Sequence, residues 1–159
     1  MRFTLTLAAA AMIALPGISS ALTLVTEAGG WEIYKSSDMG NGCLMSSTFE
    51  DGTLVNIGFD LSNDVGFAAV YNDGWSGIED GAEYAVTLNL DSASYTADAV
   101  GLKDSTLNGI YATFDDGDFL ADLALKKTFS LVSDGEEVAL LDLGGSRNAV
   151  LAMIECSGF

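Results

Sequence analysis

The chain has 159 residues and a formal net charge of −17 at pH 7, from six basic and 23 acidic side chains. This charge repels phosphate backbones and anionic lipids, so we expect binding neither to nucleic acid nor to a membrane surface. Apolar residues make up 49% of the chain and fall in periodic runs. The high net charge therefore does not imply disorder.

The first residues have the pattern of an export signal. Arg2 supplies a positive charge, Leu5 to Leu15 form an apolar run, and Pro16-Gly17 interrupt it. Ser19-Ser20-Ala21 place small residues at the −3 and −1 positions of a cleavage site, so we expect cleavage after Ala21. The apolar run is too short to span a bilayer, and no later stretch resembles a membrane span.

We expect residues 1–21 to be a signal peptide and residues 22–159 to form a single β-rich domain, periplasmic or secreted. Cleavage would leave 138 residues, with five basic and 23 acidic side chains. A chain of this length is long enough to bury a substantial core.

The chain has two cysteines, Cys43 and Cys156. Two cysteines in an exported chain most often pair with each other, so we expect a disulfide between them. Two free thiols are the alternative. Neither cysteine lies in a C-x-x-C motif, which makes a redox role unusual.

Short segments with alternating apolar residues, separated by Gly and Asp turns, predict antiparallel β structure. No crossover helix separates the first strands, so they cannot be parallel neighbours. Asp51-Gly52, between two alternating runs, is a strong hairpin signal. The expected strands are Trp31–Lys35, Cys43–Phe49, Leu54–Phe59, Val65–Tyr71, Glu83–Leu90, Tyr95–Leu102 and Leu107–Phe114, with Leu22–Thr26 either a first strand or a loose tail.

The pattern changes after Phe114. Residues 118–127 have helical apolar spacing, with acids before the first turn and lysines at the end, which complements a helix dipole. Two more strands, Phe129–Ser133 and Glu137–Leu143, are expected to form a hairpin. A last helix over residues 148–155 follows, with Ser146 as its expected N-cap. The fold class is therefore α+β, mainly antiparallel β, as a sandwich or a partly open barrel with two short helices in the C-terminal half.

The sequence contains no histidine. This absence removes the Ser-His-Asp and Cys-His mechanisms and the usual zinc sites. Because Asp142 precedes Gly144-Gly145, a carboxylate-based hydrolase of the aspartic type remains an alternative function. Leu143, however, occupies the position where such enzymes have Thr or Ser. Because the acids at 115–118 offer oxygen ligands, a calcium-stabilised protein is a second alternative. Their spacing, however, is not that of an EF-hand. We assign no catalytic residue, no metal ligand and no cofactor.

Aromatic residues are the best candidates for ligand contact. Trp75 is notable because it lies in a loop, between Gly74 and Ser76, rather than in a strand. We expect Trp75, with Tyr71 and Asn72, to form a binding surface. Aromatic residues in a β domain otherwise belong mostly to the core.

The order of aromatic residues, turns and cysteines resembles small exported proteobacterial domains of unassigned function. That order is Trp31-x-Ile33, Cys43, Asp51-Gly52, Asn72 to Trp75, Gly81-x-x-Tyr84, Leu141-x-Leu143-x-Gly145-Ser146-x-x-Ala149 and Cys156. The resemblance covers nearly all of residues 22–159 and implies a periplasmic β-rich fold with a Cys43–Cys156 bridge, without an activity. The chain is also similar to the invasion-associated locus B proteins. It has fewer cysteines than that family, so no role is carried over.

The function that these observations favour is a non-enzymatic binding or envelope-accessory module, with a protein or small-molecule partner that the sequence does not identify. The carboxylate-based hydrolase and the calcium-stabilised acidic envelope protein remain as alternatives.

Overall fold

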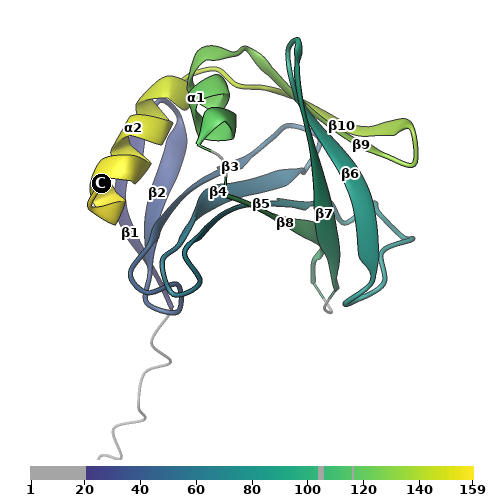
Figure 1. The fold of residues 1–159 in the computed structure, drawn as a ribbon, viewed down its shortest axis with the longest axis horizontal. Coiled ribbons are helices and arrows are strands. Elements are labelled where there is room, and N and C mark those ends of the chain that lie inside the picture. The colour runs from purple at the N-terminus through teal and green to yellow at the C-terminus, as the bar shows by residue number, and fades with distance from the viewer. Residues whose placement is uncertain (1–20, 104–105, 116) are drawn as a thin grey trace, which may run out of the picture.

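The computed structural model describes residues 21–103, 106–115 and 117–159. The signal peptide expected at residues 1–21 therefore lies outside the described residues, except for Ala21. Ten strands form one antiparallel sheet in the order β1-β2-β3-β4-β5-β8-β7-β6-β9-β10. The sheet is strongly curved but open, and two helices lie against one part of it (Figure 1). Among the described residues, no helix is long and apolar enough to cross a membrane.

The strands match the expected ones, with small differences at their ends. They are β1 (Leu22–Ala28), β2 (Trp31–Ser36), β3 (Cys43–Thr48), β4 (Leu54–Asp60), β5 (Val65–Tyr71), β6 (Glu83–Leu90), β7 (Ala93–Lys103), β8 (Asn108–Phe114), β9 (Thr128–Ser133) and β10 (Glu136–Asp142). The segment from Leu22 is a strand rather than a loose tail. The fold class is confirmed, and a single curved sheet corresponds to the partly open barrel of the two expected arrangements.

The sheet order departs from the chain order after β5. Strands β1 to β5 are sequential neighbours, but β5 then pairs with β8, and β6 pairs with β7 and β9. The loop between β5 and β6, residues 72–82, must therefore pass the ends of β8 and β7 to reach β6. Backbone hydrogen bonds join it to both strands, from the Asn72 amide to the Asn108 carbonyl and from the Gly81 amide to the Gly101 carbonyl.

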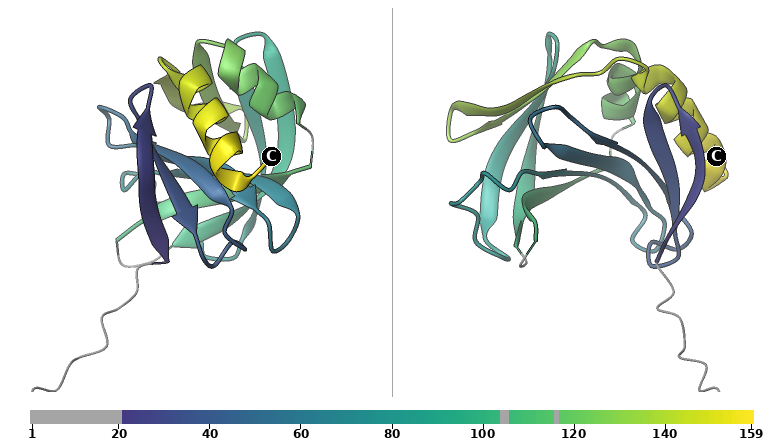
Figure 2. Two further views of the ribbon diagram at one scale, coloured as in Figure 1. Left: turned by 90° about the vertical axis from the view of Figure 1, so that its left-hand side faces the viewer. Right: turned by 180° about the vertical axis from the view of Figure 1, so that it is seen from behind.

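The main core lies on the inner face of the sheet, where the helices also pack. Because side chains alternate along a strand, β5 contributes Ala68 and Val70 to this core and turns Phe67 and Ala69 to the outer face. Helix α1 (Asp118–Leu125) and helix α2 (Ser146–Ser157) bury apolar side chains against the same core. The side views show the two helices next to each other, with α2 beside the first strands (Figure 2).

The start of α2 differs from the prediction. The N-cap is Gly145, with φ of 78°, and Ser146 is the first helical residue, so the prediction of Ser146 as N-cap is wrong. The Ser146 side chain is buried and its Oγ donates a hydrogen bond to the Leu123 carbonyl oxygen of α1, at 2.7 Å. The hydroxyl thus joins two helices instead of capping its own. The N-cap of α1 is likewise a glycine, Gly117, without a side-chain hydrogen bond.

A disulfide between Cys43 and Cys156 is confirmed, with the two Cα atoms 5.9 Å apart. It joins β3 to α2 across 113 positions of sequence. Next to it, the Cys43 amide donates a hydrogen bond to the Ser157 hydroxyl at 3.0 Å. Such a bridge is typical of proteins that fold in an oxidising compartment.

Asp91, in the turn between β6 and β7, holds the start of β9. Its carboxylate accepts hydrogen bonds from the Lys127 amide and from the amide and hydroxyl of Thr128, at 2.8 to 3.1 Å. The Thr128 hydroxyl and the Lys127 amide lower the pKa of Asp91 below its ordinary value of 3.8.

This shift predicts a pH-dependent contribution to stability. A lowered pKa in the folded state means that the contribution is present above about pH 4 and is lost as the pH falls through the folded-state pKa. Asp91→Asn resembles the protonated acid, so its melting temperature should lie below that of the wild type at pH 7, and the gap should close at low pH. Asp98→Asn, at an exposed position of β7, is the control. A gap that does not depend on pH would contradict this role of Asp91.

Candidate functional site

Trp75 lines a pocket of about 380 Å³ on the inner face of the sheet. The walls come from the 72–82 loop, β6, β8, β9 and β10, and we call this cavity the Trp75 pocket. Its lining residues are Trp75, Gly77, Ile78, Tyr84, Val86, Ile110, Leu131, Ser133, Glu136 and Val138. The tip of the β9–β10 hairpin, which supplies Ser133 and Glu136, lies on the side of the sheet away from α2 (Figure 1). A mostly apolar cavity of this size with a few polar groups is typical of a small-ligand site.

Hydrogen bonds fix the loop that carries Trp75. The Trp75 amide donates to the Asn72 carbonyl oxygen at 3.0 Å, and the Gly74 amide donates to the Asn72 side-chain oxygen at 2.8 Å. At the other end of the loop, the Tyr84 hydroxyl accepts a hydrogen bond from the Glu79 amide at 3.0 Å. Hydrogen bonds therefore hold the loop at both ends.

Three polar groups around the Trp75 pocket have no hydrogen-bond partner within the described part of the chain. They are the indole N–H of Trp75, the Ser133 hydroxyl and the Glu136 carboxylate. Trp75 is half-buried and packs against the main core. The pocket can therefore offer one donor, one hydroxyl and one negative charge to a molecule placed between apolar walls.

The structure separates the three residues expected to bind together. Trp75 lines the pocket on the inner face, whereas Tyr71 packs on the outer face with Phe67. Asn72 lies in the turn between them, and its side-chain amide donates to the Thr53 hydroxyl at 2.9 Å. Asn72 is thus engaged in holding the loop, and Tyr71 does not face the Trp75 pocket.

Tyrosines form a smaller cluster on the outer face of the sheet. Phe67 and Tyr111 stack with ring centroids 5.3 Å apart and an interplanar angle of 20°. Burial raises the pKa of Tyr111, with a further contribution from the negative charge of Asp60. Tyr34 and Tyr71 complete the aromatic side of this cluster.

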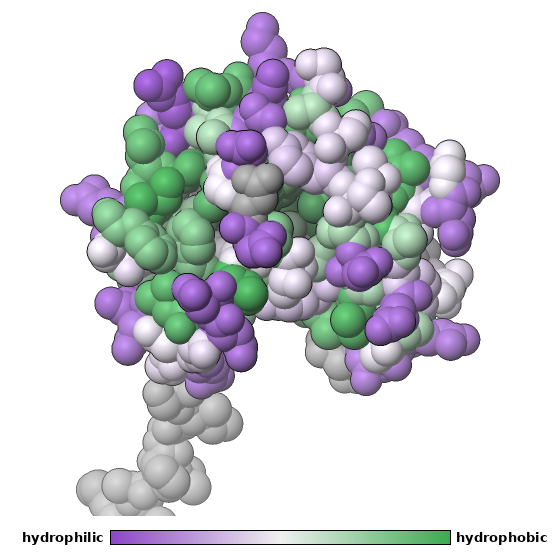
Figure 3. Space-filling view, viewed as in Figure 1, coloured by the Kyte–Doolittle hydropathy of each residue, from purple (hydrophilic) through white to green (hydrophobic). Residues whose placement is uncertain are grey.

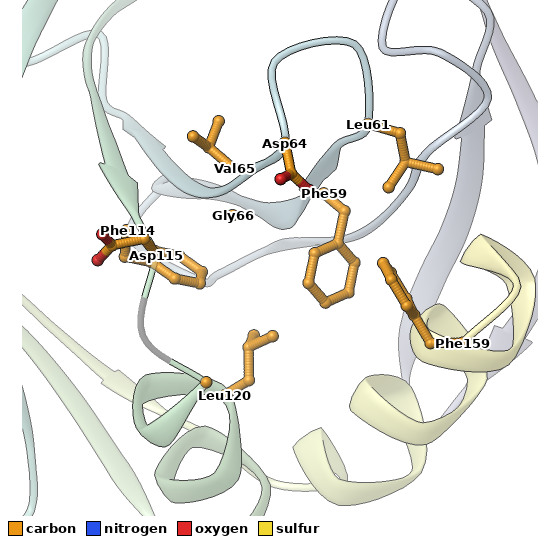
Figure 4. A pocket seen from close by; sticks show the side chains of 10 residues that line it. Phe59, Leu61, Asp64, Val65, Gly66, Phe114, Asp115, Leu120 and Phe159 are labelled. Carbon is orange, nitrogen blue, oxygen red and sulfur yellow. The ribbon is translucent and has the colours of Figure 1, made fainter.

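A second cavity lies between the β4–β5 turn and the two helices (Figure 4). Its volume is about 200 Å³, and it adjoins a groove of about 410 Å³ between α1 and α2. Phe59 and Phe159 meet at its edge, with ring centroids 4.9 Å apart. Hydrophobic surface gathers over this part of the molecule (Figure 3). The cavity's ionisable side chains are Asp64 and Asp115, and the groove has none.

Asp142, the residue of the hydrolase alternative, lies at the end of β10. Its Oδ1 accepts a hydrogen bond from the Gly144 amide at 2.8 Å, so the carboxylate closes a turn. The pocket beside it, about 480 Å³ in volume, contains the cations Lys126, Lys127 and Arg147 and no second acid. An aspartic-type mechanism needs two neighbouring carboxylates, and this arrangement does not supply them.

The acids of the calcium alternative do not form a cluster in the described residues. No group of three or more His, Cys, Asp or Glu side chains there is arranged to hold a metal ion. Asp116, in the middle of that acidic stretch, lies outside the described residues.

The fold and the pocket together define a small, disulfide-linked, half-open antiparallel β structure with two covering helices. Its fold is similar to that in the crystal structure of invasion associated protein B from Bartonella henselae, with a TM-score of 0.58. The two chains are 16% identical, and the match covers 84% of this chain and 97% of that one. At this identity the likeness shows the fold alone. It agrees with the similarity to invasion-associated locus B proteins read from the sequence.

No known protein-family model matches the chain. A search of curated proteins found no match either.

Proposed function

We propose that the protein is an exported, non-enzymatic binding module that holds a flat, mainly apolar, positively charged ligand group in the Trp75 pocket. The observation that carries this proposal is the combination of apolar walls with the Trp75 indole, the Ser133 hydroxyl and the Glu136 carboxylate. Export is supported by the signal-like residues 1–21 and by the Cys43–Cys156 bridge. The same two features support a periplasmic location or secretion.

The preference for a cation follows from the charges at the pocket. Glu136 is the ionisable acid among the lining residues, and no Lys or Arg lines the cavity. Trp75 and Tyr84 present aromatic rings, which attract cations through their negative faces. A hydrogen bond to a charged group contributes about 1.5–3 kcal/mol, which corresponds to roughly tenfold or more in affinity.

Three small aromatic probes of matched shape test this proposal. Benzamidine carries a positive charge, benzamide is neutral, and benzoate carries a negative charge. In NMR titrations of the disulfide-intact protein, benzamidine should shift the Trp75 indole resonance and should bind about tenfold more tightly than benzoate.

Variants of the lining residues locate the binding. Trp75→Ala and Glu136→Gln should each weaken benzamidine binding about tenfold, since each removes one contact with the cation. Tyr71→Phe is the matched control, because Tyr71 lies on the outer face. Equal binding of benzamidine and benzoate, or binding that survives Trp75→Ala, would exclude this site.

A further inference from the structure

Strand β10 is a free edge of the sheet. It is the last strand in the sheet order, and β9 is its partner among the described residues. Two of its apolar side chains are exposed, Val138 at 38% and Leu140 at 60%. An edge strand of this kind presents unpaired backbone groups that another extended chain can use.

This edge also borders the Trp75 pocket. Glu136 and Val138 of β10 line the pocket. The register with β9 shifts between Glu137 and Ala139, so Val138 is an extra residue at that point. An added strand next to β10 would therefore lie beside the pocket opening. Leu140, between the core residues Ala139 and Leu141, points to the other face of the sheet.

We propose that β10 accepts an extended segment of a partner protein as an eleventh strand, and that this segment places a lysine or arginine side chain in the Trp75 pocket. This rests on the proposed function, because it uses the same pocket. In strand addition, backbone hydrogen bonds give affinity and pockets for alternate side chains give specificity. Residues on the other face of the added strand would cover Leu140, so the segment alternates cationic and apolar side chains.

Charge complementarity selects this partner. The hairpin tip carries Asp134, Glu136 and Glu137, and Asp142 ends the strand. A second copy of the chain would be a poor occupant: antiparallel pairing of two β10 strands centred on Ala139 sets Glu136 opposite Asp142 at both ends. Like charges directly opposite each other are destabilising in a sheet. Each copy also carries a large negative charge, formally −17 for the full sequence.

The other free edge, β1, also exposes apolar side chains, namely Leu22, Leu24 and Val25. It differs from β10 because Glu27 is its single acid and none of its residues lines the Trp75 pocket. A variant of β1 is therefore a matched control for a variant of β10.

The probe is a six-residue peptide that alternates arginine and valine, acetylated and amidated at its ends, titrated against the disulfide-intact protein. The same peptide with glutamate in place of arginine should bind at least tenfold more weakly. Two further peptides are methylated on backbone amide nitrogens, one at every arginine and the other at every valine. Alternate amides of a strand point to opposite edges, so one of these two peptides should lose binding at least tenfold and the other should keep it.

Variants then place the peptide on the protein. Leu140→Lys should weaken binding of the arginine–valine peptide at least fivefold and leave benzamidine binding unchanged. Leu24→Lys on β1 should change the binding of neither probe. Peptide binding that tolerates both N-methylation patterns, or that is lost in Leu24→Lys but not in Leu140→Lys, overturns strand addition at β10. A wild-type dimer that dissociates when Leu140 is replaced by lysine would also overturn the proposal.

The two proposals can fail separately. Benzamidine binding without peptide binding would overturn the strand addition and leave the proposed function intact. If neither probe binds, both proposals fall.

Discussion

Removal of the Cys43–Cys156 bridge should lower the free energy of unfolding by about 4–5 kcal/mol, the largest single loss that we expect. The bridge closes a loop with a sequence separation of 113 residues. In the chain-entropy model, a cross-link over such a long loop restricts the unfolded chain strongly and so favours the folded state. Helix α2 should nevertheless stay in place, because its own side chains Ala149, Val150 and Met153 remain buried against the core.

The measurement is urea unfolding followed by circular dichroism, with the Cys43→Ser/Cys156→Ser double variant compared with the wild type. Reducing agent should bring the wild type close to the double variant and should leave the double variant unchanged. A double variant that unfolds at the wild-type urea concentration would show that the bridge does not determine stability.

Gly145→Ala should destabilise the protein by about 3 kcal/mol, much more than the same change at Gly135. Both glycines have positive φ, 78° at Gly145 and 80° at Gly135. A left-handed conformation costs a non-glycine residue about 1–2 kcal/mol. At Gly135 a Cβ atom would enter open space, whereas at Gly145 it would run into the backbone of Gly29.

The difference between the two variants therefore isolates the close approach of Gly29 and Gly145, which sets the β1–β2 turn against the start of α2. Chemical unfolding of both variants measures it directly. Equal losses would mean that the two backbone segments can separate without cost, in which case the packing of α2 against the first strands is looser than the structure indicates.

The strands could be predicted because local signals define them. Asp-Gly turns and two-residue periodicity indicated the β3–β4 and β9–β10 hairpins. The turn at Asp134-Gly135 has the two positive φ angles of a tight β-hairpin. The sheet order could not be predicted, since β5–β8 and β6–β9 join segments far apart in the chain. The role of Ser146 was missed for the same reason. Its hydrogen-bond partner, Leu123, belongs to another helix.

The candidate site was predictable only in part. Trp75 was identified by its place in a loop between small residues. The residues that complete the pocket, Ser133, Glu136 and Val138, come from a hairpin about sixty positions later, and no local pattern links them to Trp75. Tyr71 was grouped with Trp75 because β5 is apolar on both faces, so its alternation does not tell which side chains point inward.

The position of α2 has a consequence for how the protein is made. This helix is the last element of the chain, and it packs against β1, β2 and β3, the first elements. During synthesis, the inner face of those strands stays uncovered until residues 146–157 have been made. Trp31 and Ile33, which belong to the core on that face, therefore gain the cover of α2 only after all the strands of the described sheet have been synthesised.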